Sequence, residues 1–463
     1  MTNFSGKPLS PKTGNAACGS PQGGGRDSRR NGVAEVSSTY LAEMASPTVP
    51  VGFKPTEVGV IPENWEVIQL GDCTSYVGSG KTNTKSRGEY PLYGSTGLIG
   101  SCERPEYSGE ALLVARVGAN AGRLNYVCGE YGVSDNTILV KTKPEHSIDY
   151  LKYWLIRKNL NTLVFGSGQP LITGTQLKEL ALPLPSKTEQ AAIANALSDV
   201  DALIGEQEKL IAKKQAIKTA TMQQLLTGRT RLPQFALRED GTPKGTKPSE
   251  LGEIPEDWEV VEFGCTLKEF RNGYAFSANG YSSTGTPIIT MAQIGLSGSF
   301  QFDISKVNKW DSEQQDSLKE FWVRDGDLLI AMTDVTPDKN LIGQMTIAKL
   351  GGIALLNQRV GLLRLKNEIA YTGYFSFLSC LPVWKTYCKG VASLGVQANI
   401  GTSDIRKAKV PLPSIKEQTA IASILSNMDA EIQALEQRLG KTRQIKQGMM
   451  QELLTGKTRL PIT

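Results

Sequence analysis

The C-terminal part of this chain repeats a segment from its middle. Residues 183–233 and 411–461 align without a gap at an offset of 228 residues, and 28 of the 51 aligned positions are identical. A shorter repeat precedes each copy, because IPENWEV at residues 61–67 returns as IPEDWEV at residues 254–260, at an offset of 193. A fixed internal repeat constrains the architecture more than any single motif. The sequence therefore predicts two similar units.

The two units resemble each other at their ends and differ between them. The segment between the two repeats is 35 residues longer in the second unit (228 − 193), and almost nothing in it aligns. Alike ends with unlike middles indicate a common frame that carries two different recognition domains.

Both copies of the long repeat have the apolar spacing of a coiled-coil helix, with steps of four and three residues. Polar Gln207 and Lys214 interrupt this seam in the first copy, and both copies continue it, at Ile217 and Ile445. Because neither helix can bury its stripe alone, mutual packing is favoured over packing of each helix on its own domain. The predicted seam residues are Ile193, Leu197, Val200, Ile204 and Ile211, with Ile421, Leu425, Met428, Ile432, Leu435 and Leu439.

The helix ends are marked by local signals. Each helix is expected to begin after a Pro-x-Pro sequence, with Ser186 and Ser414 as N-caps and a glutamate three residues later. Each is expected to end before the glycine of Leu-Leu-Thr-Gly, at Gly228 and Gly456. About 39 residues at about 1.5 Å each give a rod of roughly 58 Å.

The segments outside the helices are rich in short β-type runs broken by Gly, Asn and Ser, each with one late helical stretch, at 148–158 and 371–388. The predicted fold class is α+β, with two mixed α/β domains and two long antiparallel helices. The predicted division is a disordered leader at 1–54, a first domain at 55–185, a first helix at 186–233, a linker at 234–248, a second domain at 249–413 and a second helix at 414–463.

Composition excludes several classes of protein. The chain has 463 residues, no apolar run of about 18 residues and no pattern of secretory signal, so we expect no membrane span. Seven scattered cysteines without a CxxC pair indicate reduced thiols in the cytoplasm. The net charge of +5 leans mildly toward acidic partners such as nucleic acid.

Catalytic signatures are missing from the sequence. It contains no GxxxxGK[ST] loop, no GxGxxG turn and no Asn/Asp-Pro-Pro-aromatic motif. The sequence predicts no catalytic residue, no cofactor and no metal site.

Polar, glycine-punctuated loops are what remains as candidate recognition chemistry. Arg and Lys can form paired hydrogen bonds with guanine, Asn and Gln with adenine, and other polar groups can hold phosphates. At the offset of 228, Gln169 aligns with Gln397, so a shared structural role and a shared DNA-facing role are both open. The candidate DNA-binding residues are Lys81, Asn83, Lys85, Arg116, Asn120, Arg123 and Gln169, with Arg271, Asn272, Tyr274, Gln397 and Asn399.

With these motifs together, residues 55–463 resemble the specificity subunit of type I restriction–modification systems. The resemblance rests on the paired Ile-Pro-Glu-x-Trp-Glu-Val starts, the paired Pro-Leu-Pro-Ser-x-x-Glu-Gln entries to the helices and the Leu-Leu-Thr-Gly ends. It implies two target-recognition domains, each recognising one half of a gapped double-stranded DNA sequence, with helices that set the gap.

The resemblance also implies a non-catalytic subunit and a set of partners. Two methyltransferase subunits, which bind S-adenosylmethionine and modify adenine, would dock on the helices, and two restriction/translocase subunits would complete the complex. The alternatives are a single-chain DNA methyltransferase or nuclease, which would need a catalytic motif, and a coiled-coil scaffold without a DNA role.

Overall fold

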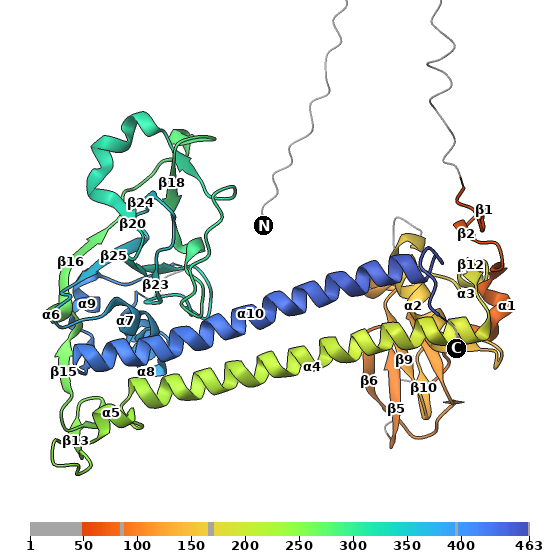
Figure 1. Cartoon of the computed structure of the whole chain (residues 1–463), viewed down its shortest axis with the longest axis horizontal. Helices are drawn as coiled ribbons and strands as arrows, with labels where there is room; N and C mark the ends of the chain where they lie inside the picture. Colours follow the sequence, from red (N-terminus) through yellow and green to blue (C-terminus); the bar gives the residue numbers. More distant parts are fainter. Residues whose placement is uncertain (1–48, 84–87, 165–170, 394–396, 462–463) are drawn as a thin grey trace, which may run out of the picture.

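Two mixed domains lie at opposite ends of a pair of long helices in a computed structural model of the chain (Figure 1). It describes residues 49–83, 88–164, 171–393 and 397–461. Helix α4 (Lys187–Leu226) and helix α10 (Ile415–Leu453) run antiparallel and form a strut between the domains. The predicted α+β class with a pseudo-twofold repeat is confirmed. Most of the predicted leader, residues 1–48, lies outside the described residues.

The first domain contains two four-stranded sheets. One has the order β4-β11-β8-β9 and the other the order β6-β5-β10-β7. In chain order its elements are β1 (Phe53–Thr56), β2 (Gly59–Pro62), β3 (Glu66–Gln69), α1 (Leu70–Cys73), β4 (Thr74–Ser79), β5 (Tyr90–Gly94), β6 (Gly97–Cys102), β7 (Tyr107–Ser108), β8 (Ala111–Ala115), η1 (Gly118–Asn120), β9 (Leu124–Val127), β10 (Glu130–Val133), β11 (Thr137–Thr142), α2 (Ile148–Lys158), η2 (Leu160–Leu163), α3 (Gly174–Lys178) and β12 (Ala181–Leu184).

The second domain has sheets of the order β16-β25-β21-β23 and β17-β19-β18-β24-β20. Helix α5 (Pro233–Ala236) precedes it. Its elements are β13 (Thr246–Ser249), β14 (Gly252–Pro255), β15 (Glu259–Glu262), α6 (Phe263–Thr266), β16 (Leu267–Asn272), η3 (Ala278–Gly280), β17 (Tyr281–Ser282), β18 (Thr286–Ile289), η4 (Met291–Gln293), β19 (Lys309–Trp310), η5 (Ser312–Phe321), β20 (Trp322–Arg324), β21 (Leu328–Ala331), β22 (Thr333–Asp334), β23 (Met345–Ile347), β24 (Ile353–Leu356), β25 (Val360–Leu365), α7 (Thr372–Leu378), α8 (Pro382–Val391), β26 (Ala398–Asn399), α9 (Thr402–Lys407) and β27 (Lys409–Leu412).

The two domains share a topology that their sequences conceal. Sheet β4-β11-β8-β9 and sheet β16-β25-β21-β23 are both fully antiparallel, and in each domain a parallel pair, β5 with β10 or β18 with β24, belongs to the second sheet. The starts of β18 and β21 are 42 residues apart, against 21 for β5 and β8, so much of the extra length of the second unit lies there.

The repeated motifs form one node at each end of the strut. The Ser414 hydroxyl accepts from the backbone N–H of Glu417 at 3.3 Å, so serine caps α10 as predicted. The Glu417 carboxylate, 2% exposed, accepts from Trp258 Nε1 at 3.0 Å and from Arg231 Nη2 at 2.8 Å. This node, which we call the second node, therefore joins the start of α10 to the segment after α4 and to the IPEDWEV motif.

The first node repeats this construction at the other end. Ser186 caps α4, and Glu189, 1% exposed, accepts from Trp65 Nε1 at 3.0 Å and from Arg459 Nη2 at 2.9 Å. Gly456 has a φ of +69°, and a Cβ there would lie 2.4 Å from Pro62. Only glycine can follow α10 at this close approach. The end of the second unit thus closes onto the start of the first.

The ends of the long helices complete the domain cores. Ile193 and Leu197, at the start of α4, share the first domain's core with Leu453 from the end of α10. Ile421 and Leu425, at the start of α10, share the second domain's core with Leu225 and Leu226 from the end of α4. Each core therefore contains both helices, and packing on a domain and mutual packing both occur.

In the middle of the strut the helices pack on each other. Of the predicted seam residues there, Ile211, Ile432 and Leu439 are buried and Val200, Ile204, Met428 and Leu435 are half-buried. The predicted continuation at Ile217 and Ile445 is wrong, because these side chains are 42% and 59% exposed. Two pairs of contacts flank the seam, and the offset of 228 relates the two members of each pair. In the first pair, Asp201 contacts Lys446 at 2.6 Å and Asp429 contacts Lys218. In the second pair, Glu208 contacts Arg443 at 2.6 Å and Glu436 contacts Gln215 at 3.3 Å.

Gln207 is a polar residue inside this contact. Its side chain is 7% exposed, and neither amide atom has a hydrogen-bond partner within the described part of the chain. Leu435 occupies the equivalent position of α10. A buried amide without partners costs roughly 1–3 kcal/mol.

Gln207→Leu is therefore expected to increase the free energy of unfolding by about 1–2 kcal/mol, since it removes an unpaired polar group from an apolar contact. The midpoint of urea unfolding would report it. Gln223→Leu, at an exposed position 16 residues away on α4, is the matched control and should change the midpoint little. A lower midpoint for Gln207→Leu would show that the amide is satisfied in solution.

Candidate nucleic-acid interface

Polar loops gather at one edge of the main sheet in the first domain. Strands β4 and β8 end where β11 begins, because Ser79 pairs with Ile138 and Ala115 pairs with Thr137. Antiparallel pairing thus brings the residues after β4, the residues after β8 and the turn before β11 together. The loop that precedes α3 joins them, since Ile172 N–H donates to the Arg116 carbonyl at 2.9 Å. We call this set of four segments the first loop edge.

The second domain builds an equivalent edge from the ends of β16 and β21, the turn before β25 and the loop of residues 397–400. Ile400 N–H donates to the Met332 carbonyl at 3.0 Å, as Ile172 does to Arg116. Met332 N–H donates to the Arg359 carbonyl at 3.0 Å, and Arg116 N–H donates to Asn136 at 3.1 Å. We call this set the second loop edge.

One glycine is required at the same place in each edge. A Cβ on Gly80 would lie 2.2 Å from the Val133 carbonyl oxygen, and one on Gly273 would lie 2.2 Å from the Leu356 oxygen. Any side chain would push the loop after β4 or β16 away from its neighbouring turn. The two loops are therefore held against their sheets in the same way although their sequences differ.

In the first edge, Arg116 is the best-anchored candidate. Its Nη1 donates to the Ser79 hydroxyl at 2.9 Å and to the Asp135 carbonyl at 3.3 Å. Its Nε is buried with no partner in the described ranges. The remaining candidates in this region are exposed Lys81, Asn83 and Arg123 and half-buried Asn120, whereas Lys85 and Gln169 lie outside the described residues.

In the second edge, Gln397 and Asn399 lie together. Asn399 Oδ1 accepts from the Thr333 hydroxyl at 2.9 Å and from Gln397 Nε2 at 3.1 Å. Exposed Asn272 is the last residue of β16, and exposed Tyr274 follows it at the same edge. Tyr274 packs against Phe276 and Phe321, with ring centroids 5.0 and 5.5 Å apart. The structure therefore brings four of the five predicted residues of this domain to one edge.

Arg271, the fifth, is engaged within its own domain. Its guanidinium pairs with Glu269 at 2.9 Å and donates to the Glu320 carbonyl at 2.7 Å. These bonds tie β16 to the η5 segment. Its donors are therefore committed to holding the domain together.

The turns before β11 and β25 contain residues that sequence reasoning missed. Exposed Gln358 and Arg359 lie in the second edge, and the Arg359 side chain makes no hydrogen bond or ion pair to any described residue. Exposed Asp135 and Asn136 occupy the corresponding turn of the first edge. The available signal was a polar triplet directly before a buried strand in each domain, Ser-Asp-Asn and Asn-Gln-Arg.

A buried carboxylate shapes the second edge. Asp334 is 2% exposed, and its oxygens accept from the backbone N–H groups of Thr336 and Leu341, each at 2.7 Å. Burial raises the pKa of Asp334, but these hydrogen bonds outweigh it and hold the pKa below its ordinary value. The charge therefore orders the loop after β22 and is not presented to a ligand.

Each domain therefore carries an edge of the same construction with different side chains, and the two edges lie at opposite ends of the strut. This arrangement defines a protein with two separate recognition surfaces. The chain belongs to the family described as the type I restriction modification DNA specificity domain, whose profile matches residues 62–218 and 255–447. Both units match. The chain is therefore a specificity subunit of a type I restriction–modification system, which recognises DNA, assembles with other subunits and is not itself an enzyme.

Known specificity subunits resemble the chain, some over most of its length and others over a part of it. It is 27% identical to the MjaVIII specificity subunit of Methanocaldococcus jannaschii, over 86% of this chain and 94% of the relative. A specificity subunit of Escherichia coli, EcoprrI, is 32% identical over 25% of this chain and 28% of its own length. The crystal structure of the M. genitalium S subunit has a TM-score of 0.54 at 16% identity, over 86% of this chain and 97% of that one, and so shares the fold.

No helix among the described residues is long and apolar enough to cross a membrane.

Proposed function

We propose that this subunit recognises a gapped DNA target made of two unrelated half-sites, one for each loop edge. The observation that carries the proposal is the repetition of the same edge on two domains with different polar side chains. Because the cores of both domains include the ends of both strut helices, the separation and orientation of the edges are fixed. A fixed separation between two recognition surfaces requires a fixed number of unread base pairs between the half-sites.

The proposed base and phosphate contacts are polar side chains of the two edges. Arg and Lys suit guanine or phosphate, and Asn and Gln suit adenine. In the first domain they are Lys81, Asn83, Arg116, Asn120 and Arg123, with Lys85 and Gln169, which lie outside the described residues. In the second they are Asn272, Tyr274, Gln358, Arg359, Gln397 and Asn399.

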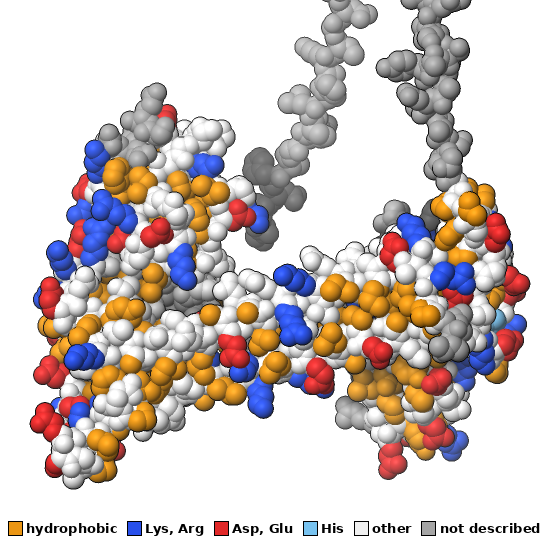
Figure 2. Space-filling model, in the orientation of Figure 1, with side chains coloured by type: hydrophobic (Ala, Val, Ile, Leu, Met, Phe, Trp, Pro, Cys, Tyr) orange, Lys and Arg blue, Asp and Glu red, His pale blue; other side chains and the backbone are white. Residues whose placement is uncertain are grey.

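The strut is the proposed docking frame for the partner subunits. Its pseudo-twofold construction offers two similar surfaces, which suits two copies of one methyltransferase subunit. Two restriction/translocase subunits complete the proposed complex. The hydrophobic side chains that show along the strut in Figure 2 give such partners apolar surface to cover.

Methylome sequencing of a host that carries this chain and its methyltransferase tests the proposal. We expect one modified motif with two unrelated halves and a constant gap. Exchange of residues 55–185 for the corresponding domain of a relative should change only one half and leave the other half intact. The residues of that domain that face α4 and α10 should be kept, because they share its core. A change in both halves would contradict the assignment of one half-site to each domain.

A further inference from the structure

The exposed surfaces of α4 and α10 carry different side chains at positions that the internal repeat makes equivalent. Leu203, Leu210 and Ile217 are 46%, 41% and 42% exposed. They are seven residues apart, so they lie on one face of α4, and we call them the α4 stripe. At the offset of 228, their equivalents on α10 are Glu431, Arg438 and Ile445. An apolar stripe on α4 thus corresponds to a largely charged one on α10.

This difference is not required by the contact between the helices. The buried seam residues Ile211, Ile432 and Leu439 lie on other faces of α4 and α10. Glu431 pairs with Lys214 at 2.6 Å, whereas the side chain of Arg438 makes no hydrogen bond or ion pair to any described residue. The α4 stripe is therefore surplus apolar surface beside an already complete helix pair.

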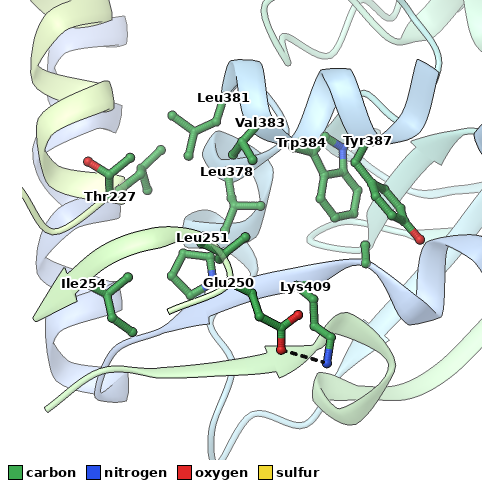
Figure 3. A pocket seen from close by; sticks show the side chains of 13 residues that line it. Thr227, Glu250, Leu251, Ile254, Leu378, Leu381, Val383, Trp384, Tyr387 and Lys409 are labelled. Carbon is green, nitrogen blue, oxygen red and sulfur yellow. Dashed lines mark ion pairs between the residues drawn. The ribbon is translucent and has the colours of Figure 1, made fainter. Parts of the chain in front are cut away.

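A second pair of equivalent sites, two cavities at the ends of the strut, also has its more apolar member beside α4. A cavity of about 240 Å³ lies where the end of α4 meets the second domain. Leu378, Val383, Trp384 and Tyr387 line it together with Thr227 and one ion pair, between Glu250 and Lys409 at 3.7 Å (Figure 3). The cavity is therefore mainly apolar.

The corresponding cavity, of about 350 Å³, lies where the end of α10 meets the first domain. Thr455 replaces Thr227 there at the offset of 228, and Glu57 replaces Glu250 at the offset of 193. The charged side chains of Arg157, Lys158 and Glu179 also line it. An apolar group that fits the cavity beside α4 would be poorly accommodated beside α10.

The spacing of the α4 stripe identifies the kind of occupant. Apolar side chains seven residues apart along a helix match the heptad spacing of another helix. Two identical partner copies present the same helix to both surfaces, and one helix cannot suit an apolar stripe and a charged stripe equally.

We infer that the two methyltransferase docking surfaces are unequal, and that the first copy docks on α4 through a helix that covers Leu203, Leu210 and Ile217. The second copy, on α10, is held more weakly. A complex with one methyltransferase subunit is then a defined intermediate of assembly. This inference rests on the proposed docking of two methyltransferase copies on the strut.

Dilution of the co-expressed complex of this chain with its methyltransferase, followed by mass photometry, tests the inference. In the wild-type complex we expect one methyltransferase copy to leave at a concentration about tenfold higher than the other. Leu210→Lys should make the copy on α4 leave as easily as the copy on α10. The double variant Glu431→Leu, Arg438→Leu copies the α4 stripe onto α10 and should bring the two dissociation steps together by strengthening the weaker one.

Ala212→Lys is the matched control, because it adds the same charge at an exposed position on the opposite side of α4 from Leu210. It should leave both steps unchanged. Loss of both copies at one concentration in the wild type would overturn the inference while leaving the proposed function intact. A wild-type chain that holds no methyltransferase would overturn both. A complex with two copies of this chain that Leu210→Lys separates would assign the stripe to self-association, and would also overturn the inference.

Discussion

Arg231→Met is expected to destabilise the chain by about 3–5 kcal/mol, because it leaves a buried carboxylate without its cation. Glu417 is 2% exposed and accepts from Arg231 Nε and Nη2 at 2.7 and 2.8 Å. The indole N–H of Trp258 would be its remaining side-chain donor. Thermal unfolding of the chain with its methyltransferase would show the loss as a lower midpoint.

Arg459→Met is the matched control at the first node. The Arg459 side chain is 37% exposed, against 11% for Arg231, and its second partner is the neutral Asn64 where Arg231 has Asp257. Because water reaches this arginine more easily, we expect a smaller decrease. Glu417→Gln combined with Arg231→Met should recover part of the loss, since no unpaired charge remains. An unchanged midpoint for Arg231→Met would show that the second node does not stabilise the fold.

Arg231 also affects how the free energy of unfolding depends on pH in the acid range. Burial raises the pKa of Asp257, but hydrogen bonds from Arg231 and Lys244 outweigh it and lower the pKa from 3.8 to about 2. A carboxyl with a depressed pKa stabilises the fold above its unfolded pKa and loses this contribution as the pH falls through its folded pKa. The contribution of Asp257 is therefore present above pH 3.8 and lost toward pH 2. Arg231→Met should weaken this dependence.

A four-residue insertion before Gly228 is expected to lengthen the unread gap of the DNA target and to leave both half-sites unchanged. Four helical residues add about 6 Å, which is roughly the rise of two base pairs. The sequence after α4 is anchored to the second domain through Gly228 and Arg231, so added length at this point is transmitted to the position of that domain. Methylome sequencing of the variant would read the gap directly.

The control is the same insertion at Asp240–Gly241, an exposed turn of the linker outside the strut. It should leave the gap unchanged. A gap that stays constant with the insertion before Gly228 would show that the strut does not set the spacing of the half-sites.

The frame was predictable from the sequence because its signals are local. The serine caps of both helices, the glycines that follow them and the seven-residue apolar spacing are all properties of short windows. Ile172 and Ile400 are related by the same offset of 228 as Gln169 and Gln397, and the two isoleucines make equivalent backbone hydrogen bonds. The seam was extended too far, to Ile217 and Ile445, because spacing does not show where two helices diverge.

The shared topology of the two domains could not be predicted. Strand pairing joins distant residues and depends on burial, so unlike sequences such as residues 74–79 and 267–272 can occupy the same place in a sheet. The edge residues Gln358 and Arg359 were missed for the same reason, because only the pairing of β25 with β16 and β21 brings their turn beside Tyr274. Arg271 was a candidate by type, but its partner Glu320 is 49 residues away.

The participation of α10 in the first domain has a consequence for biosynthesis. Met450, Leu453 and Leu454 fill a core whose other residues lie between 61 and 197, and Arg459 neutralises Glu189. These residues leave the ribosome about 250 residues after the rest of that core, because α10 lies so much later in the chain. The first domain therefore remains incomplete, with apolar surface uncovered, until α10 has been synthesised.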